Sequence, residues 1–213
     1  GLTSHDLVLF LRRRFKIKKV GHAGTLDPMA TGVLVMLLGN ATKLSNKFIS
    51  DDKEYEGSMR LGIKTDSHDK EGKVISSKDI SGIKEESVRE SFRAFLGDIE
   101  QVPPMVSAVK YKGKKLYQLA RRGVEVERKP RPIHIYNIEI KSIDLPIVSF
   151  SVCCSKGTYI RKLADDIGER LGCGAHLTSL RRLRSGRFGI DKAIPFADLK
   201  DFDEERLGEH IIQ

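Results

Sequence analysis

The chain reads Gly21-His22-Ala23-Gly24-Thr25-Leu26-Asp27-Pro28-Met29-Ala30-Thr31-Gly32 from residue 21 to residue 32. The three glycines permit backbone conformations that other residues resist, and Pro28 favours an extended conformation at Asp27. Residues 18–32 are therefore predicted to form an ordered loop that aims one carboxylate in a fixed direction. Two interpretations of Asp27 remain open: it is a nucleophile or base, or it only organises a turn. The physical chemistry of the residues alone favours the turn.

The segments on either side of this loop have the patterns of regular structure. A helix is expected to begin at Thr3 or Ser4, both good N-caps, because apolar residues then recur every three to four positions. After the loop, the continuous apolar run at 33–38 predicts a buried strand. A short helix is expected at 42–48.

The rest of the chain mixes strand and helix patterns without a regular alternation. Amphipathic helices are predicted at 88–96, ending at Gly97, and at 158–171. Strands are predicted at 55–61, 74–75, 99–102, 124–126, 133–143 and 147–153. This order indicates an α+β fold with a largely antiparallel sheet.

The charge of the chain is basic and unevenly distributed. Lys and Arg number 38 against 29 acidic residues, giving a formal net charge of +9. Basic residues dominate 12–19, 102–132 and 176–187. Folded onto one face, these segments would suit a nucleic acid; the other interpretation is three ordinary solvated surfaces. Charge alone favours nucleic acid only slightly.

Residues 103–132 have the composition of an insertion, with Pro103-Pro104 at one end and Pro130 and Pro132 at the other. Between them, two tyrosines are interleaved with many Lys and Arg residues. Such a mixture suits phosphate contacts and base stacking. A solvated helical hairpin whose tyrosines pack on the body fits equally well.

The cysteines and the hydropathy limit the classes of protein to which the chain can belong. Cys153 and Cys154 are adjacent and Cys173 is distant, so they predict neither a disulfide framework nor a zinc ligand set. No apolar run approaches the length of a membrane span, and the first residues do not resemble a signal peptide. We expect a soluble cytoplasmic protein without a metal.

His22 and Arg161 are further candidates for chemistry. His22 can be a base, an RNA contact or a packed loop residue, and a lone histidine is most often the last. Arg161 follows a Gly-containing strand-to-helix junction. Its guanidinium can pair with a carboxylate in a fixed fork, or it is a surface residue of the first helical turn.

A series of segments carries a family resemblance through its order and spacing. The segments are Gly21-His22-Ala23-Gly24-Thr25-Leu26-Asp27-Pro28 with Ala30-Thr31-Gly32, Tyr55, Arg60-Leu61-Gly62 with Thr65-Asp66, Val102-Pro103-Pro104 with Ser107-Ala108, Tyr111-Lys112-Gly113 with Leu116-Tyr117, Cys154-Ser155-Lys156-Gly157-Thr158-Tyr159-Ile160-Arg161, Leu171-Gly172-Cys173-Gly174-Ala175, Leu180-Arg181-Arg182 and Arg184-Ser185-Gly186. Over about residues 1–195 the sequence resembles the TruB family of pseudouridine synthases, bacterial enzymes that modify the T-loop uridine of tRNA.

The resemblance implies three catalytic residues. Asp27 matches the catalytic aspartate of the family. Tyr55 matches the tyrosine that stacks on the target base, and Arg161 matches the arginine that pairs with the catalytic carboxylate. The implied fold is the pseudouridine synthase fold, which is α+β with a mixed, largely antiparallel sheet, flanking helices and a central catalytic cleft.

The resemblance also implies residues that bind the substrate. His22 matches a histidine linked to holding the flipped-out nucleotide, and Leu180 matches an apolar residue of the uracil pocket. Tyr159 and Arg181 lie inside matched segments and are expected to contact the substrate. The insertion matches a mobile segment that closes over the RNA. Its candidate phosphate contacts are Lys110, Lys112, Lys114 and Lys115.

The implied reaction is isomerisation of uridine-55 of tRNA to pseudouridine, without a cofactor. The expected partner is the tRNA T stem-loop, with no membrane, no obligate protein partner and a monomeric enzyme. Residues 1–195 are expected to form the catalytic domain. The tail at 196–213 is expected to stand where the family has a small C-terminal RNA-binding domain, which would be absent or truncated, and the family's usual first strand would precede Gly1.

Three other functions compete with this one. A non-enzymatic RNA-binding or RNA-folding protein would not require Asp27 beside phosphates. A guide-RNA-dependent relative of the family would act inside a multi-protein particle, whereas the context of Cys154-Ser155-Lys156 and the long basic insertion look like the stand-alone bacterial type. A DNA-binding module is the weakest alternative.

Overall fold

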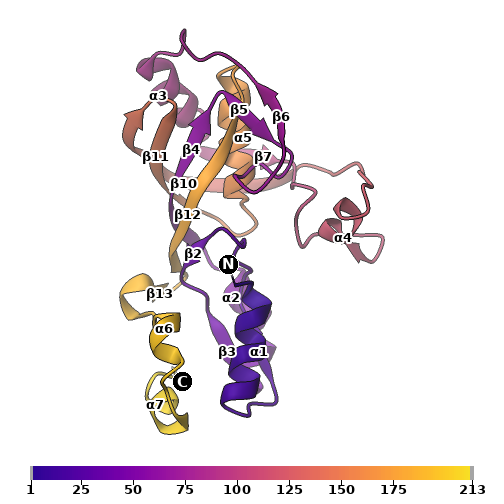
Figure 1. Cartoon of the computed structure of the whole chain (residues 1–213), viewed down its shortest axis with the longest axis vertical. Coiled ribbons are helices and arrows are strands. Elements are labelled where there is room, and N and C mark those ends of the chain that lie inside the picture. The colour runs from indigo at the N-terminus through magenta and orange to yellow at the C-terminus, as the bar shows by residue number, and fades with distance from the viewer. Residues whose placement is uncertain (1, 212–213) are drawn as a thin grey trace. The chain divides into compact units, whose positions relative to one another are not determined.

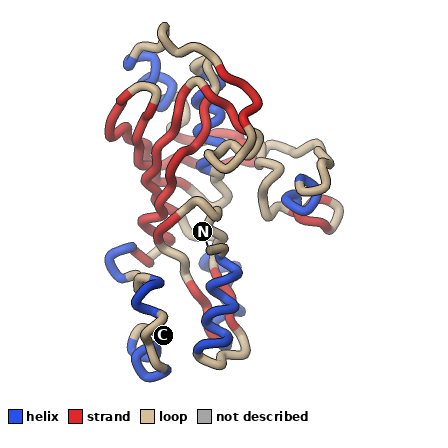
Figure 2. Tube along the Cα trace, viewed as in Figure 1, coloured by secondary structure: helices blue, strands red, loops and turns tan. Residues whose placement is uncertain are grey.

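The computed structural model describes residues 2–211, and its chain divides into two compact units. The first unit combines residues 1–51 with 182–213, and the second comprises residues 52–181. Figure 1 labels the elements of both, and Figure 2 shows that most of the strand structure belongs to the second unit. Each unit is described by itself.

The second unit is built on an antiparallel sheet. Its strands follow the order β12-β4-β11-β10-β7, and the pairs β4–β11, β11–β10 and β10–β7 are antiparallel. Their bounds are β4 (Lys53–Leu61), β7 (Gly97–Gln101), β10 (Arg131–Asp144), β11 (Ile147–Cys154) and β12 (Ala175–Ser185), whose last residues belong to the first unit. The prediction of an α+β fold with a largely antiparallel sheet is confirmed.

The core of the second unit lies between this sheet and two helices, α3 (Glu85–Arg93) and α5 (Ile160–Arg170). Along β11 every second residue is buried, as expected for a strand with one face on the core. The ring of Phe150 from β11 meets that of Phe92 from α3 edge to face, with centroids 5.6 Å apart. The helix predicted at 88–96 ends at Arg93, so Leu96 lies outside it and is exposed.

Smaller elements complete the second unit. A two-stranded sheet pairs β5 (Ile63–Thr65) with β6 (Val74–Ser77). The insertion contains β8 (Lys110–Tyr111), β9 (Lys114–Lys115) and α4 (Leu116–Ala120). The strand predicted at 124–126 is wrong: Gly123 has φ +70°, and the amide of Val124 donates to Leu119 O at 3.1 Å. These residues end α4 with a left-handed cap instead of pairing with another strand.

In the first unit, α1 (Ser4–Arg14) begins as predicted. Thr3 and Asp6 form a capping box, in which Thr3 Oγ1 accepts from the amide of Asp6 at 3.2 Å and Asp6 Oδ2 accepts from the amide of Thr3 at 2.8 Å. The remaining elements are β1 (Val20–His22), β2 (Thr31–Gly32), β3 (Met36–Leu38), η1 (Gly39–Leu44), α2 (Ser45–Ile49), β13 (Phe188–Gly189), η2 (Ile190–Lys192), α6 (Phe196–Leu199) and α7 (Glu204–Glu209).

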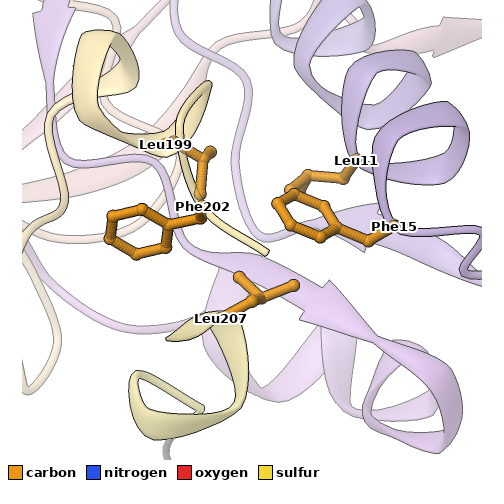
Figure 3. Packing of buried hydrophobic residues seen from close by; sticks show 5 residues of the cluster. All are labelled: Leu11, Phe15, Leu199, Phe202 and Leu207. Carbon is orange, nitrogen blue, oxygen red and sulfur yellow. The ribbon is translucent and has the colours of Figure 1, made fainter. Parts of the chain in front are cut away.

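The apolar run at 33–38 supplies two cores of the first unit. Val33, Val35 and Leu37 are buried in one cluster with Ala23, whereas Met36 and Leu38 pack against the other cluster. That second cluster joins α1 to the C-terminal helices and is formed by Leu11, Phe15, Leu199, Phe202 and Leu207 (Figure 3). Successive side chains point to opposite sides, so a run that is buried on both sides is apolar throughout. Only residues 36–38 of the predicted strand pair as a strand.

The longest element that the sequence did not predict is β12. The charge of the segment 176–187 indicates a surface that contacts nucleic acid or solvent, and the family resemblance adds roles for Leu180 and Arg181 but no secondary structure. In the structure, residues 175–185 form a strand in which Leu180 and Arg182 are buried and Arg181 between them is exposed. The interpretation of the basic residues of this segment as a surface is therefore wrong for Arg182, which is buried.

Candidate active site

The loop that carries Asp27 is fixed at its start by a β-hairpin. β1 and β3 pair antiparallel, with Val20 opposite Leu38 and His22 opposite Met36. The amide of Ala23 continues this ladder by donating to Val35 O at 2.9 Å. His22 is thus the last residue of β1 and is half-buried. The structure brings His22 and Asp27, both predicted as site residues, into one loop of the first unit.

A turn places Asp27 at the far end of this loop. The carbonyl of Asp27 accepts from the amide of Ala30 at 2.8 Å, and Pro28 occupies the second position of the turn, which its fixed φ suits. The main chain of Asp27 thus organises a turn, as one of the two interpretations expected. The half-buried side chain takes no part in this main-chain bond.

Two further contacts of the loop come from residues distant in sequence. On α1, Ser4 Oγ accepts from the amide of Leu26 at 3.0 Å, one residue before Asp27. On β12, the buried guanidinium of Arg182 donates to Gly24 O. Gly24 and Gly32 have φ of +92° and +100°, which confirms the prediction that glycines permit unusual backbone geometry in this loop. Sequence reasoning missed the part played by Ser4 and Arg182.

In the second unit, Tyr55 and Leu180 lie on the same side of neighbouring strands. Tyr55 is half-buried on β4, two residues before Gly57, so both face one side of the sheet. Leu180 Cδ1 on β12 lies 3.4 Å from the position that a Cβ of Gly57 would occupy. Gly57 therefore leaves the space that Leu180 fills.

Arg161 is not the surface residue that one interpretation expected, because it is only 3% exposed. Its Nη1 donates to Ser67 O and its Nη2 donates to Val106 O, both at 2.9 Å. Its Nε lies 3.6 Å from Asp69 Oδ2. Arg161 thereby connects α5 to the loop after β5 and to the first residues of the insertion. Its pairing with Asp27 stays a prediction, and its contact with Asp69 was not expected from the sequence.

Tyr159 precedes α5 and is held through its main chain. Its amide donates to Gln101 Oε1 at 2.8 Å, and its carbonyl accepts from Gln101 Nε2 at 3.2 Å. Gln101 is buried at the end of β7. These two hydrogen bonds between the Gln101 side chain and the main chain of Tyr159 fix the start of the helix that carries Arg161. Arg181 is exposed on β12, so its predicted contact with substrate is sterically open.

The four lysines predicted to bind phosphate lie on one hairpin. β8 and β9 pair so that Lys110 stands opposite Lys115 and Tyr111 stands opposite Lys114. Lys112 and Gly113 form the turn, both with positive φ. All four lysines are exposed. Lys112 Nζ lies 5.5 Å from the ring centre of Tyr111, and Lys115 Nζ lies 5.7 Å from that of Tyr117.

A buried carboxylate on α5 stabilises the surroundings of Arg161. Asp165 has a side chain 2% exposed and lies 2.7 Å from Lys162 Nζ, 3.3 Å from Lys64 Nζ and 3.3 Å from His68 Nδ1. Burial alone would raise the pKa of Asp165, but His68 and Lys162 outweigh burial and bring the pKa well below its ordinary value. The carboxylate is therefore ionised in the folded protein at neutral pH.

Asp165→Asn is expected to lower the free energy of unfolding by about 3 kcal/mol at pH 7, because it removes the buried carboxylate that two lysines and His68 share. The folded pKa lies below the unfolded value of about 3.9, so the stabilisation is full above that pH, declines below it, and is lost only as the pH falls through the folded pKa. Urea unfolding of the variant and of wild type at pH 7 and pH 3 measures the difference in their free energies of unfolding. The difference between variant and wild type should be smaller at pH 3 than at pH 7 and should persist in part, because the folded carboxylate is still ionised at pH 3.

Glu169→Gln is the matched control for Asp165→Asn. Glu169 also pairs with Lys64, at 2.9 Å, but its side chain is 54% exposed. Exposed pairs contribute about 0–1 kcal/mol. Equal losses for the two variants would contradict the importance of the buried carboxylate.

Among residues 2–211, no group of three or more His, Cys, Asp or Glu is arranged to hold a metal ion. Within the same residues, no helix combines the length and apolar character that crossing a membrane requires.

Comparisons with known proteins identify the family to which this chain belongs. The family model described as the N-terminal domain of TruB family pseudouridylate synthase matches residues 12–160. The model of the tRNA pseudouridylate synthase B C-terminal domain matches residues 161–212. Both describe one class of enzyme, the synthases that make pseudouridine. The chain belongs to the TruB family of these pseudouridylate synthases, and the resemblance noted in the sequence is confirmed.

Individual relatives match this chain over most of its length. The tRNA pseudouridine synthase B of Clostridium tetani is 50% identical over 212 residues, which are 100% of this chain and 72% of the relative. That of Protochlamydia amoebophila is 52% identical over 200 residues, 93% of this chain and 76% of the relative. The division of the chain at residue 195 into a catalytic domain and a tail stays a prediction.

Solved structures with the same fold come from multi-component complexes. A Cbf5-Nop10-Gar1 complex contains a chain that is 33% identical, with a TM-score of 0.75 over 99% of this chain and 55% of that one. An H/ACA RNP bound to a substrate RNA contains one that is 29% identical, with a TM-score of 0.71. The chain thus spans about half the length of these neighbours. They confirm the α+β pseudouridine synthase fold.

Proposed function

We propose that this protein converts uridine-55 in the T stem-loop of tRNA to pseudouridine, with Asp27 as the essential carboxylate. We further propose that it acts in the cytoplasm as a monomer and needs no cofactor or obligate protein partner. The observation that carries the proposal is the Asp27 loop, whose backbone is bonded to α1, β3 and β12 within the first unit of a TruB family member.

The reaction requires no redox chemistry. The bond between ribose C1′ and uracil N1 breaks, a bond between C1′ and C5 forms, the C5 proton is lost and N1 gains a proton. Asp27 either attacks C6 of the uracil or assists departure of the base from the sugar, and both routes remain open. Each route needs the base out of its stack, at a cost of a few kcal/mol. Stacking on Tyr55 and packing on Leu180 are proposed to offset this cost.

The lysine hairpin supports a polyanionic partner. Lys110 and Lys115 face each other across the strands, and like charges that are directly opposite destabilise a hairpin. An RNA phosphate beside them would relieve this repulsion. Basic side chains lie close to the rings of Tyr111 and Tyr117. RNA-binding surfaces use this combination of basic and aromatic side chains.

The identities favour the stand-alone reaction over the guide-dependent one. Relatives named tRNA pseudouridine synthase B reach 50–52% identity, whereas the chains from the Cbf5-Nop10-Gar1 complex and the H/ACA RNP reach 29–33%. We therefore propose that tRNA itself is the substrate and that no guide RNA is required.

Tritium release from a tRNA transcript labelled at uracil C5 tests the proposed function. Purified protein alone should release tritium from the T-loop uridine of unmodified tRNA, and should release none from a DNA copy of the hairpin labelled in the same way. Release only after addition of a guide RNA and partner proteins would favour the guide-dependent alternative. A folded protein that binds tRNA but releases no tritium would overturn the proposal in favour of a binding role.

Replacement of the four hairpin lysines by glutamine is expected to weaken tRNA binding and to flatten its salt dependence. Each lost phosphate contact removes about 0.7–0.9 from the slope of log K against log salt, so the slope should fall by about 3. Filter binding between 50 and 300 mM salt, a range of about sixfold, measures this. The substituted residues are Lys110, Lys112, Lys114 and Lys115.

The charge-matched control replaces four exposed lysines of the same unit outside the insertion. These are Lys70, Lys73, Lys84 and Lys141. The control should change the slope by less than the hairpin variant does. Equal slopes for the two variants would mean that the hairpin makes no specific phosphate contact and that only net charge matters.

A further inference from the structure

Arg182 is an arginine buried inside a segment that is otherwise rich in exposed charge. It is only 1% exposed, whereas Arg181 beside it is exposed. Transfer of a guanidinium from water into the protein costs several kcal/mol unless its donors are satisfied. In the described part of the chain no carboxylate forms an ion pair with Arg182, and its side-chain hydrogen bonds go to main-chain carbonyls. Such a residue has no access to RNA phosphates.

The carbonyls that Arg182 binds lie on both sides of Asp27. Nε donates to Val33 O at 2.7 Å, and Nη2 donates to Gly24 O at 3.1 Å. The main chain adds a third contact, because the amide of Val33 donates to Arg182 O at 2.9 Å. Both polar main-chain groups of Val33 are therefore bonded to Arg182. One residue of β12 thus ties the two ends of the segment 24–33 together.

The guanidinium suits this task in a way that other cations do not. Its donors are fixed in one plane, so Nε and Nη2 reach two carbonyls at once. A lysine ammonium is a single flexible point and cannot hold both in one geometry. The position of the Gly24 carbonyl also depends on the φ of +92° at this residue, a conformation that residues with a Cβ rarely adopt. Together with the Ser4 contact to Leu26, Arg182 determines where the main chain of Asp27 lies.

We propose that Arg182 is a positioning residue for Asp27, acting through the backbone of segment 24–33 without touching RNA. This rests on the proposed function, because Asp27 is the group that it positions. Misplacement of a reacting group by about 1 Å costs on the order of a hundredfold in rate. Arg182 therefore contributes to kcat and not to tRNA affinity, in contrast to the arginines exposed on the surface.

Arg182→Lys tests the proposal. The kcat for tritium release is expected to fall by about ten- to a hundredfold, with KM and the tRNA dissociation constant within about twofold of wild type. The salt slope of binding should not change, because no phosphate contact is lost. Amide hydrogen exchange across segment 24–33 should become faster. The exchange readout does not depend on activity, so it tests the anchoring even if wild type releases no tritium and the proposed function fails.

Leu207→Ala separates positioning from a general loss of stability. Leu207 is buried in the cluster of α1, α6 and α7, and its truncation should lower the melting temperature of the unit that contains Asp27. This variant should keep its kcat below its melting temperature. The proposal is overturned if Arg182→Lys keeps the wild-type kcat and loop exchange, if Leu207→Ala loses kcat equally, or if Arg182→Lys loses tRNA affinity with a flatter salt slope.

Gly24→Ala provides a second variant if Arg182→Lys does not fold. The φ of +92° at Gly24 is strained for alanine, so the carbonyl that Arg182 binds should shift, and kcat should fall with tRNA affinity retained. Gly39→Ala is its control, because Gly39 also has positive φ but its carbonyl accepts from Thr42 and not from Arg182. Equal kcat values for these two variants would overturn the proposal.

Discussion

Asp27→Asn is expected to lower the rate of tritium release by about 10⁴-fold, the order of loss when an essential catalytic group is removed. The dissociation constant for tRNA should stay within about twofold, because asparagine has nearly the same shape. The turn should also persist, since Ala30 bonds to the main-chain carbonyl of residue 27 and not to its side chain. Single-turnover tritium release and filter binding, performed on the same preparation, measure both quantities.

This variant separates the two interpretations of Asp27 that the sequence left open. If Asp27 only organised a turn, asparagine would replace it well, because both residues favour such turns, and turnover would remain within a few-fold of wild type. That result would refute the assignment of an essential carboxylate. Asp191→Asn, at an exposed position in the same unit, controls for the loss of one negative charge.

Local signals in the sequence predicted the elements whose determinants are close together in the chain. The capping box of α1 involves residues 3 and 6, and the long hairpin of β10 and β11 joins adjacent segments. The Asp27 loop was recognised from its glycines and from the family resemblance. These features need no knowledge of distant contacts.

Long-range contacts explain what the sequence did not predict. The bonds from Arg182 to Val33 and Gly24 span 149 and 158 positions, so nothing near Arg182 in the sequence distinguishes it from the exposed Arg181. The burial of Arg161 has the same cause, since its bond to Ser67 spans 94 positions. An arginine pattern gives the charge of a segment, but only the fold decides which guanidinium faces carbonyls and which faces solvent.

The same limit applies to pairs of site residues. The alternation along β4 places Tyr55 and Gly57 on one face, and this can be derived from the sequence once β4 is recognised. That Leu180 fills the space beside Gly57 depends on β12 being the neighbour of β4. Because β12 was not predicted, the family resemblance was the only route to Leu180 as a site residue.

Gly32→Ala is expected to have the second largest effect, on both stability and turnover. A Cβ at residue 32 would lie 2.1 Å from Arg182 O and 2.7 Å from Arg182 N. Both are backbone atoms of β12, so no side-chain rotation relieves the clash. The φ of +100° adds strain for any residue with a Cβ. We expect a loss of about 3–5 kcal/mol in unfolding free energy, and at least about a hundredfold loss of tritium release.

Gly39→Ala distinguishes the steric clash from backbone strain. Gly39 has φ +57° and nothing within 4 Å of the added Cβ, so it should lose only about 1–2 kcal/mol and keep its turnover. Urea unfolding and tritium release on both variants give the comparison. Because β2 pairs with β12, displacing residue 32 also displaces Val33 from Arg182, and the loop loses its anchor on the C-terminal side of Asp27. Similar stability and turnover in the two alanine variants would mean that β2 does not need to approach β12 so closely for Asp27 to act.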